Sequence, residues 1–270
     1  MERVGEHPVP AGPLAVRWLA YELPELRAGT TGTARLQVEN AGTATWRATG
    51  DRAVQFSYHW LDDRGNAIVW DGVRTPLDRM VEPGQRAELE LTLELPQPPG
   101  RYRLAFDVLE EYRFWWSEVG VLPLELEIDV RPRIDARRLG VDVRGGPDAR
   151  TAAALATQEE PLVEHDPVAV AYLVAGAAPA PDWARRTLDA LAEGYVAVGG
   201  SIEAPDRALR PWAPGGGRKP GFPHPLLLPS LLVGLQPVVH EGLPAYRPGE
   251  DPWLFDGRIR LTLPRGRHRR

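Results

Sequence analysis

Apolar and polar residues alternate with period two through much of residues 14–130, and this pattern restricts the fold more than any other feature of the chain. Each alternating run predicts a β-strand with one buried face and one face in water. Turns rich in Asn, Gly and Pro separate the runs. Short strands joined in this way favour an antiparallel β-sandwich. The clearest runs are 34–38, 54–60, 87–95, 102–108 and 124–130.

Aromatic residues of this region are expected to build the core. Trp60 and Tyr102 lie in phase with apolar neighbours, and Trp46 follows a turn. Two adjacent tryptophans, Trp115 and Trp116, precede the last run. Because successive residues of a strand point to opposite faces, we expect at least one of this pair to be exposed as a protein-binding patch. The alternative is that one fills the core and the other packs under a loop.

The turns and aromatic residues of the first half occur in a specific order: Asn40-Ala41-Gly42-Thr43, Trp46, Pro83-Gly84 and Pro99-Gly100-Arg101-Tyr102-Arg103-Leu104. This ordered set resembles the bacterial relatives of the four-tryptophan immunoglobulin-like domain, over about residues 14–130. The resemblance implies an immunoglobulin-like sandwich that serves as a docking or carbohydrate-adjacent module. It also implies that this half supplies no catalytic residues.

The composition changes at residues 131–150, where Arg, Gly and Pro become frequent and large apolar residues become rare. We expect a linker here, or a short strand at 139–143 that opens the next domain. The linker separates two folding units, the sandwich and a second domain over 151–264. Residues 1–13 are then an N-terminal extension, and residues 265–270 are a basic tail.

The second half follows a strand–helix–strand pattern. Residues 168–174 are continuously apolar, as in a strand buried on both faces. Pro181-Asp182 begins a predicted helix that ends at Gly194, and a second strand follows over 195–202. The spacing predicts a βαβ unit. The fold class is therefore an immunoglobulin-like antiparallel β-sandwich followed by a small α/β domain. A further helix over 226–235 and a final strand over 258–263 complete the prediction.

Residues 168–202 resemble a second family through Pro181-Asp182-Trp183 and Val196-Ala197-Val198-Gly199-Gly200. In family-two glycosyltransferases, a Pro-x-Trp helix follows a metal-binding Asp-x-Asp strand. This chain has Ala175-Gly176-Ala177-Ala178 where that family keeps its aspartates. The resemblance implies a degenerate or truncated transferase-like domain that does not use a divalent metal. A generic βαβ unit explains the same residues.

A glycine-rich segment, Gly215-Gly216-Gly217-Arg218-Lys219, places backbone amides beside two cations that can hold a phosphate or carboxylate. It is not a P-loop, because Pro220 stands in place of the Ser or Thr. An exposed loop is the alternative. Nearby aromatic residues either stack on a sugar or anchor a proline-rich segment. The candidate ligand-binding residues are Trp212, Gly216, Arg218, Lys219 and Tyr246.

No catalytic residue can be assigned from the sequence. His224, His240 and Glu241 are the weak candidates for acid–base work, and a structural role is the alternative. The chain contains neither an HExxH nor a G-x-S-x-G motif. It has no cysteine, and its histidines show no known ligand spacing, so neither a metal nor another cofactor is expected.

The charge and composition limit the partners. The net charge of −5 argues against nucleic acid, which attracts basic surfaces. With 43% hydrophobic and 26% charged residues, the chain is expected to be globular. It lacks the pattern of a signal peptide and any apolar stretch of membrane-spanning length. We therefore expect a cytoplasmic location and no membrane insertion; the oligomeric state stays open.

Three functions remain from the sequence. The favoured one is a non-catalytic binding or accessory protein in bacterial glycan or cell-envelope polysaccharide assembly, with a glycan or a glycan-assembly protein as its partner. This expectation rests on family resemblance. The first alternative is a metal-independent glycosyltransferase-like or hydrolytic enzyme with its site at residues 212–241. The second is a structural scaffold.

Overall fold

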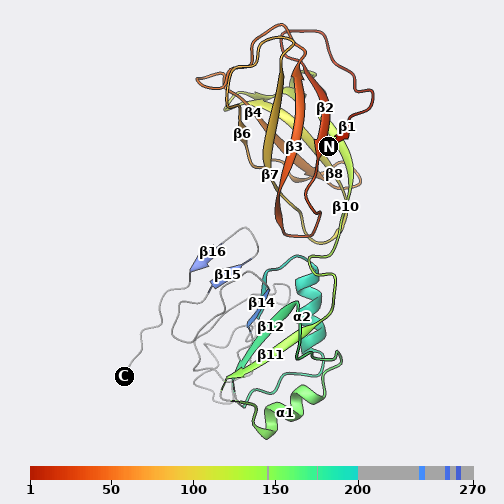
Figure 1. Ribbon diagram of the computed structural model, residues 1–270, viewed down its shortest axis with the longest axis vertical. Helices are drawn as coiled ribbons and strands as arrows, with labels where there is room; N and C mark the ends of the chain where they lie inside the picture. The colour runs from red at the N-terminus through yellow and green to blue at the C-terminus, as the bar shows by residue number, and fades with distance from the viewer. Residues whose placement is uncertain (145, 175, 200–236, 241–252, 256–259, 263–270) are drawn as a thin grey trace, which may run out of the picture. The chain divides into compact units, whose positions relative to one another are not determined.

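The computed structural model describes residues 1–144, 146–174 and 176–199, together with three short strands at 237–240, 253–255 and 260–262 (Figure 1). The chain divides into two compact units, Met1–Arg131 and Pro132–Arg270. Each unit is described by itself below.

The first unit contains two antiparallel β-sheets. One sheet has the strand order β1-β2-β3-β7, and the other has the order β10-β8-β4-β5 with β6 beside β4 and β9 beside β8. Every strand pair in this unit is antiparallel, and the two sheets enclose one apolar core, so the unit is an antiparallel β-sandwich as the alternation predicts. The strands are β1 (Glu2–Arg3), β2 (Val16–Glu22), β3 (Thr31–Asn40), β4 (Val54–Leu61), β5 (Ala67–Val69), β6 (Thr75–Pro76), β7 (Arg86–Glu94), β8 (Gly100–Glu110), β9 (Phe114–Trp115) and β10 (Leu124–Val130).

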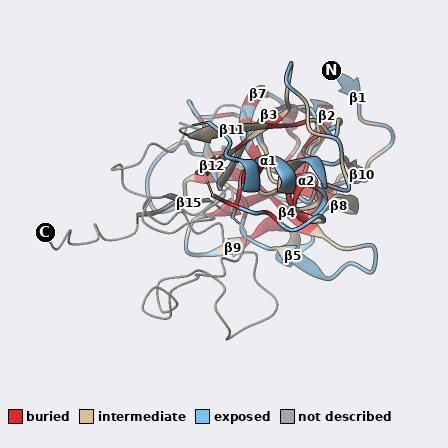
Figure 2. Cartoon of the chain, turned by 90° about the horizontal axis from the view of Figure 1, so that it is seen from below, coloured by how far each residue is buried: buried red, intermediate tan, exposed pale blue. Residues whose placement is uncertain are grey.

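The core lies between the sheets and consists of the apolar residues of each alternating run (Figure 2, red). Trp46 is 1% exposed and Trp60 is fully buried, which confirms both as core residues. Tyr102 is only half-buried. Its hydroxyl donates a hydrogen bond to the carbonyl oxygen of Pro98, and burial raises the pKa of this phenol.

The turn after β3 holds Trp46 in place. Asn40 is completely buried, and its side-chain amide donates to the carbonyl oxygens of Ala44 and Val81, each at 2.9 Å. Its Oδ1 accepts from the backbone N–H of Gly42 at 3.1 Å. Trp46 and Val81 exchange two backbone hydrogen bonds of 3.0 Å. The buried side-chain amide of Asn40 is thus fully hydrogen-bonded, so its burial leaves none of its polar atoms without a partner.

The second unit has a four-stranded sheet with the order β11-β12-β14-β13. Strands β11 and β12 are parallel and joined through α1, whereas β14 is antiparallel to both β12 and β13. Strands β15 and β16 pair antiparallel. The elements are β11 (Leu139–Arg144), α1 (Ala149–Ala156), β12 (Ala169–Val174), α2 (Trp183–Ala192), β13 (Ala197–Gly199), β14 (Pro237–His240), β15 (Trp253–Phe255) and β16 (Arg260–Thr262).

Two boundaries differ from the sequence prediction. The expected linker 131–150 contains all of β11 and the start of α1, so most of it belongs to the second unit. Strand β11 is the one that the alternative placed at 139–143, at the opening of the second domain. The expected extension 1–13 contains β1, which pairs with β2. In both cases, backbone pairing orders a segment whose composition alone suggests a connection.

Helix α2 follows the sequence prediction closely. The apolar face proposed for it is buried: Trp183, Thr187, Leu188 and Leu191. The helix ends at Ala192, and Gly194 follows with a positive φ of 121°. The predicted strand 195–202 contains β13, but β14 lies between β13 and β12. The predicted helix 226–235 lies outside the described residues.

Candidate functional site

The outer face of the sheet that contains β4 and β8 is buried at its centre. Ser57 and His59 on β4, and Asp107 on β8, alternate with core residues and therefore point away from the core. The sequence prediction placed them in water, and it is wrong, because each is at most 3% exposed. Side chains from other segments of the first unit must cover this face.

Two tryptophans provide the cover. Trp70 lies in the connection between β5 and β6, and Trp115 lies on β9, where it pairs with Leu109 of β8. The Trp70 ring stacks on the imidazole of His59, with centroids 4.1 Å apart and planes inclined by 21°. The Trp115 ring meets the same imidazole edge-on at 4.4 Å. His59 is thus enclosed by two indoles.

Both nitrogens of His59 have polar neighbours. Nδ1 donates to the carbonyl oxygen of Trp70, since a carbonyl can only accept. Nε2 lies 3.5 Å from Oδ2 of Asp107. The other carboxylate oxygen, Oδ1, accepts from the backbone N–H of Val108 at 2.7 Å. The buried imidazole therefore connects the Trp70 segment to the sheet.

These buried polar residues do not form a hydrolytic triad. Ser57 lies directly opposite Asp107 in the register, and its buried Oγ has no hydrogen-bond partner. A catalytic histidine must direct one nitrogen at the serine hydroxyl. Both nitrogens of His59 are engaged elsewhere, so the trio has a structural arrangement.

Gly72 lets the Trp70 segment approach the sheet. Its backbone N–H donates to the carbonyl oxygen of Tyr58 at 3.0 Å. A Cβ atom at this position would lie 2.6 Å from the same oxygen and 2.7 Å from the tyrosine ring. Only glycine fits this distance without movement of the backbone.

The outward side of this cluster carries an aromatic ring and charges. Trp70 is 46% exposed, although one of its faces is stacked on His59. The Arg74 guanidinium lies 5.9 Å from the Trp115 ring centroid and forms ion pairs with Asp71 at 3.3 Å and Glu111 at 2.9 Å. We call the group Trp70, Asp71, Arg74 and Glu111 the Trp70 platform.

Of the two expectations for Trp115 and Trp116, exposure of one ring is wrong, and the alternative, in which one fills the core and the other is covered, agrees with the structure. The two side chains do face opposite sides, since Trp115 contacts His59 and Trp116 packs on Trp46 in the core at 5.7 Å. However, Trp115 is only 8% exposed and Trp116 is fully buried. Partner binding through these two residues would require the cover to open.

The sequence does contain a signal for the buried outer face. The outward positions of β7 carry acidic residues such as Glu88 and Glu90, as a face in water does. The corresponding positions of β4 carry Gln55, Ser57 and His59. Unlike Glu, none of these side chains must carry a charge at neutral pH. The exposed Trp70 has no comparable signal, because its turn is too short to show periodicity.

The residues proposed from the second half are mostly outside the described part of the chain. This applies to Trp212, Gly216, Arg218, Lys219, His224, Glu241 and Tyr246. His240 is the last residue of β14, where its backbone pairs with Ala169. That these residues form one site therefore stays a prediction.

The start of α1 is capped by the chain itself. Asp148 accepts from the backbone N–H of Thr151 at 2.8 Å, and the buried Thr151 hydroxyl accepts from the backbone N–H of Gly176 at 3.0 Å. The hydrogen bonds from Thr151 hold the pKa of the Asp148 carboxyl below its usual range. This carboxylate occupies the position at which a helix start would otherwise attract an anion.

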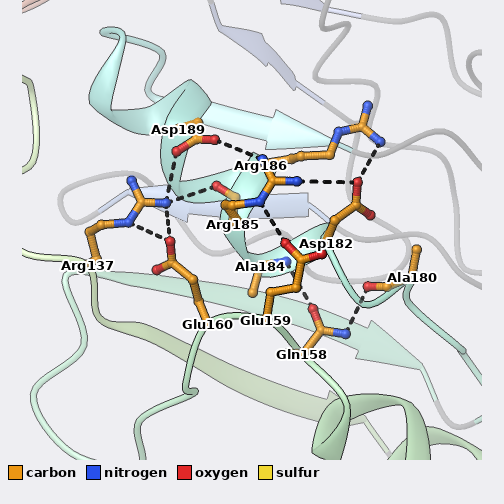
Figure 3. A network of polar contacts seen from close by, with 10 residues as sticks. All are labelled: Arg137, Gln158, Glu159, Glu160, Ala180, Asp182, Ala184, Arg185, Arg186 and Asp189. Atoms are coloured by element: carbon orange, nitrogen blue, oxygen red, sulfur yellow. Dashed lines mark hydrogen bonds and ion pairs between the residues drawn. The ribbon is translucent and has the colours of Figure 1, made fainter.

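A polar network joins the segment after α1 to the start of α2 (Figure 3). Gln158 donates to the carbonyl oxygen of Ala180 at 2.9 Å and accepts from the backbone N–H of Ala184 at 3.0 Å. Arg185 pairs with Glu159 at 2.7 Å. Further ion pairs join Arg137 to Glu160 and Asp189. These partly exposed pairs stabilise the unit only modestly.

Within the described residues, no group of three or more His, Asp and Glu side chains is arranged to hold a metal ion. No helix in that part of the chain is long and apolar enough to cross a membrane.

No family model and no curated protein matches the chain. Among solved structures, a family 123 glycoside hydrolase from Clostridium perfringens matches 47% of this chain at 10% identity and a TM-score of 0.23, and the chain covers only 26% of that enzyme. The putative ApaA protein from Bordetella pertussis matches 44% of this chain and is covered to 92%, at 19% identity and a TM-score of 0.22. The ASH/PapD-like domain of human CEP192 matches 45% and is covered to 86%, at 16% identity and a TM-score of 0.22.

Proposed function

We propose that the protein is a non-catalytic binding module whose ligand is a glycan, and that a sugar ring packs on Trp70. The observation that carries this proposal is a half-exposed indole fixed by stacking on the buried His59, with the paired charges of Asp71 and Arg74 following it closely in the chain. A pyranose has apolar C–H faces that pack on an aromatic ring, and hydroxyls that hydrogen-bond at its rim. Fixing the ring before binding lowers the entropy cost of binding.

We also propose that the first unit is an immunoglobulin-like sandwich and that the second is a small α/β domain. Strand order supports an immunoglobulin-like sandwich, because β2-β3-β7 and β10-β8-β4 reproduce its two-sheet arrangement. The hydrogen bond from Tyr102 to Pro98, at the start of β8, corresponds to the tyrosine corner of such folds. For the second unit, the parallel pair β11 and β12 supports a small α/β domain. We further propose that the protein acts in the cytoplasm as an accessory to glycan or cell-envelope polysaccharide assembly.

The test is binding of soluble polysaccharides to the full chain by affinity gel electrophoresis. Dextran, mannan, β-1,3-glucan and chitosan oligosaccharides serve as probes. We expect at least one of them to retard the wild type, and Trp70→Ala to weaken that binding about tenfold, as loss of an aromatic anchor does. Trp70→Phe keeps a flat ring and should retain most of the affinity.

The matched control is Tyr112→Ala, which removes a 99% exposed aromatic side chain from a turn of the same unit. It should bind as the wild type does. Equal loss in both variants, or no retardation by any probe, contradicts the proposal.

The transferase alternative is tested by nucleotide release from nucleotide sugars with Mn²⁺ or a chelator. Metal-independent release that disappears in the Arg218→Ala/Lys219→Ala variant would establish that alternative.

A further inference from the structure

We infer that the Trp70 platform accepts uncharged or cationic sugars and excludes acidic ones. This inference rests on the proposed glycan-binding function and adds the chemical class of the ligand. It follows from the charges of the Trp70 platform and from the way they are paired.

Arg74 is the cation closest in sequence to Trp70, and its guanidinium already forms two ion pairs. Its Nε lies 2.9 Å from Glu111 and its Nη2 lies 3.3 Å from Asp71. The guanidinium also lies 5.9 Å from the centroid of the Trp115 ring, which is itself 6.3 Å from the centroid of Trp70. A carboxylate on a sugar stacked on Trp70 would have to approach Arg74 beside these two acids, which repel it.

The other charges of the Trp70 platform are acidic. The side chains of Asp71 and Glu111 are 60% and 25% exposed, so both can meet a ligand. Asp107 lies beneath the ring system, next to His59. Arg113, in the same turn as Glu111, is paired with the buried carboxylate of Glu110. The exposed Asp71 and the half-buried Glu111 therefore share a single cation, which disfavours an anion and leaves acceptors for hydroxyl or ammonium groups.

These charges are partly in water, so their effect on binding is moderate and depends on salt. Unfavourable contacts between exposed charges weaken binding by small factors that multiply. We expect an acidic polymer to bind on the order of tenfold more weakly than a neutral one at low ionic strength. The difference should shrink as salt is added, because screening acts over about 8–10 Å at physiological ionic strength.

The experiment compares dextran, chitosan oligosaccharides and polygalacturonate as probes of the full chain. The variant Asp71→Asn/Glu111→Gln removes both acids and releases Arg74 while Trp70 stays in place. We expect this variant to gain affinity for polygalacturonate by about tenfold and to lose affinity for chitosan oligosaccharides.

The matched control is Glu22→Gln/Glu90→Gln. These two acids pair with Arg35 at 3.7 and 3.0 Å on the other sheet, so the control makes the same charge change and releases an arginine where no exposed tryptophan stands. It should not change the preference among the probes.

The outcomes separate the two proposals. If the wild type binds polygalacturonate as well as it binds dextran, and Trp70→Ala abolishes both, glycan binding stands and the exclusion of acidic sugars is overturned. The exclusion is also overturned if the control gains affinity for polygalacturonate as much as the Asp71/Glu111 variant does. If none of these three probes and neither mannan nor β-1,3-glucan binds the wild type, the glycan-binding proposal falls, and the charge preference that rests on it falls with it.

Discussion

Trp70 owes its orientation to His59. The imidazole supports one face of the indole at 4.1 Å and donates to the carbonyl oxygen of the same residue, so it fixes both the ring and its backbone. His59 in turn lies beside the Asp107 carboxylate, which is only 1% exposed. An acid at this depth depends on its polar neighbours, because a buried charge without partners is costly.

Replacing His59 by Ala is expected to lower the free energy of unfolding of the first unit by about 3 kcal/mol. The substitution leaves Asp107 buried beside an apolar side chain and removes the stacking on Trp70. Urea unfolding followed by tryptophan fluorescence measures the loss. The double variant His59→Ala/Asp107→Ala should be at least about 1 kcal/mol more stable than the sum of the single effects implies.

Gln55→Ala is the matched control, since Gln55 lies on the same face of β4 but is half-buried and outside the aromatic cluster. We expect a change within about 0.5 kcal/mol for it. A loss below about 1 kcal/mol for His59→Ala, or strict additivity in the double variant, would show that the two residues do not support each other.

At the scale of elements, the connection between β5 and β6 contacts β4 closely at one point, where Gly72 lies against Tyr58. Gly72 is buried, and a Cβ would meet the carbonyl oxygen of Tyr58 at 2.6 Å. Such a contact moves the backbone instead of a flexible side chain. Because Trp70 stands two residues before this glycine, the position of the exposed ring depends on it.

Gly72→Ala is therefore expected to destabilise the first unit by about 1–3 kcal/mol, as overpacking does, and to displace Trp70 from His59. The displacement should appear as a red-shifted tryptophan emission and easier quenching by acrylamide. Gly5→Ala is the control, because a Cβ at Gly5 meets nothing within 4 Å. If both alanine variants show the wild-type emission and stability, the close approach at Gly72 does not position the ring.

Strands β3, β4, β7, β8 and β10 could be predicted from the sequence, but the cover of β4 and β8 could not. Alternation reports which side of a strand is apolar, and it correctly placed Phe56, Tyr58 and Trp60 in the core. It cannot report a third layer contributed by distant residues. His59 is buried by Trp70 and Trp115, and the latter is separated from it by the whole of β7 and β8. For the same reason, alternation could not show that Trp115 and Trp116 are both covered.

At the scale of the whole molecule, the described residues form two separate apolar cores. The core of the first unit ends with Val130, and that of the second begins at Ile134. Arg131 is still hydrogen-bonded into the first unit, since its N–H donates to Leu26 at 2.8 Å and its carbonyl oxygen accepts from Ala28 at 2.9 Å. The sequence placed the boundary within 131–150, because Arg, Gly and Pro are frequent there, although backbone pairing orders most of that interval.

A fragment of residues 1–131 is therefore expected to fold by itself. It contains every member of the first apolar core and both sheets of the sandwich, and its length is typical of one domain. Circular dichroism should show a β-type spectrum, and urea should unfold the fragment in one cooperative transition.

The fragment should also keep the fluorescence signature of the stacked Trp70, because His59, Gly72 and Trp115 all lie within it. Trp70→Ala in the fragment provides the reference spectrum for that ring. A fragment that ends at residue 120 is the matched comparison, since it lacks β10, which pairs with β8 along seven residues and carries core residues of the sandwich. We expect the shorter fragment to be unfolded. If the 1–131 fragment is unfolded while the full chain is stable, the first unit needs the second one to fold, and the separation of the two cores does not make them independent.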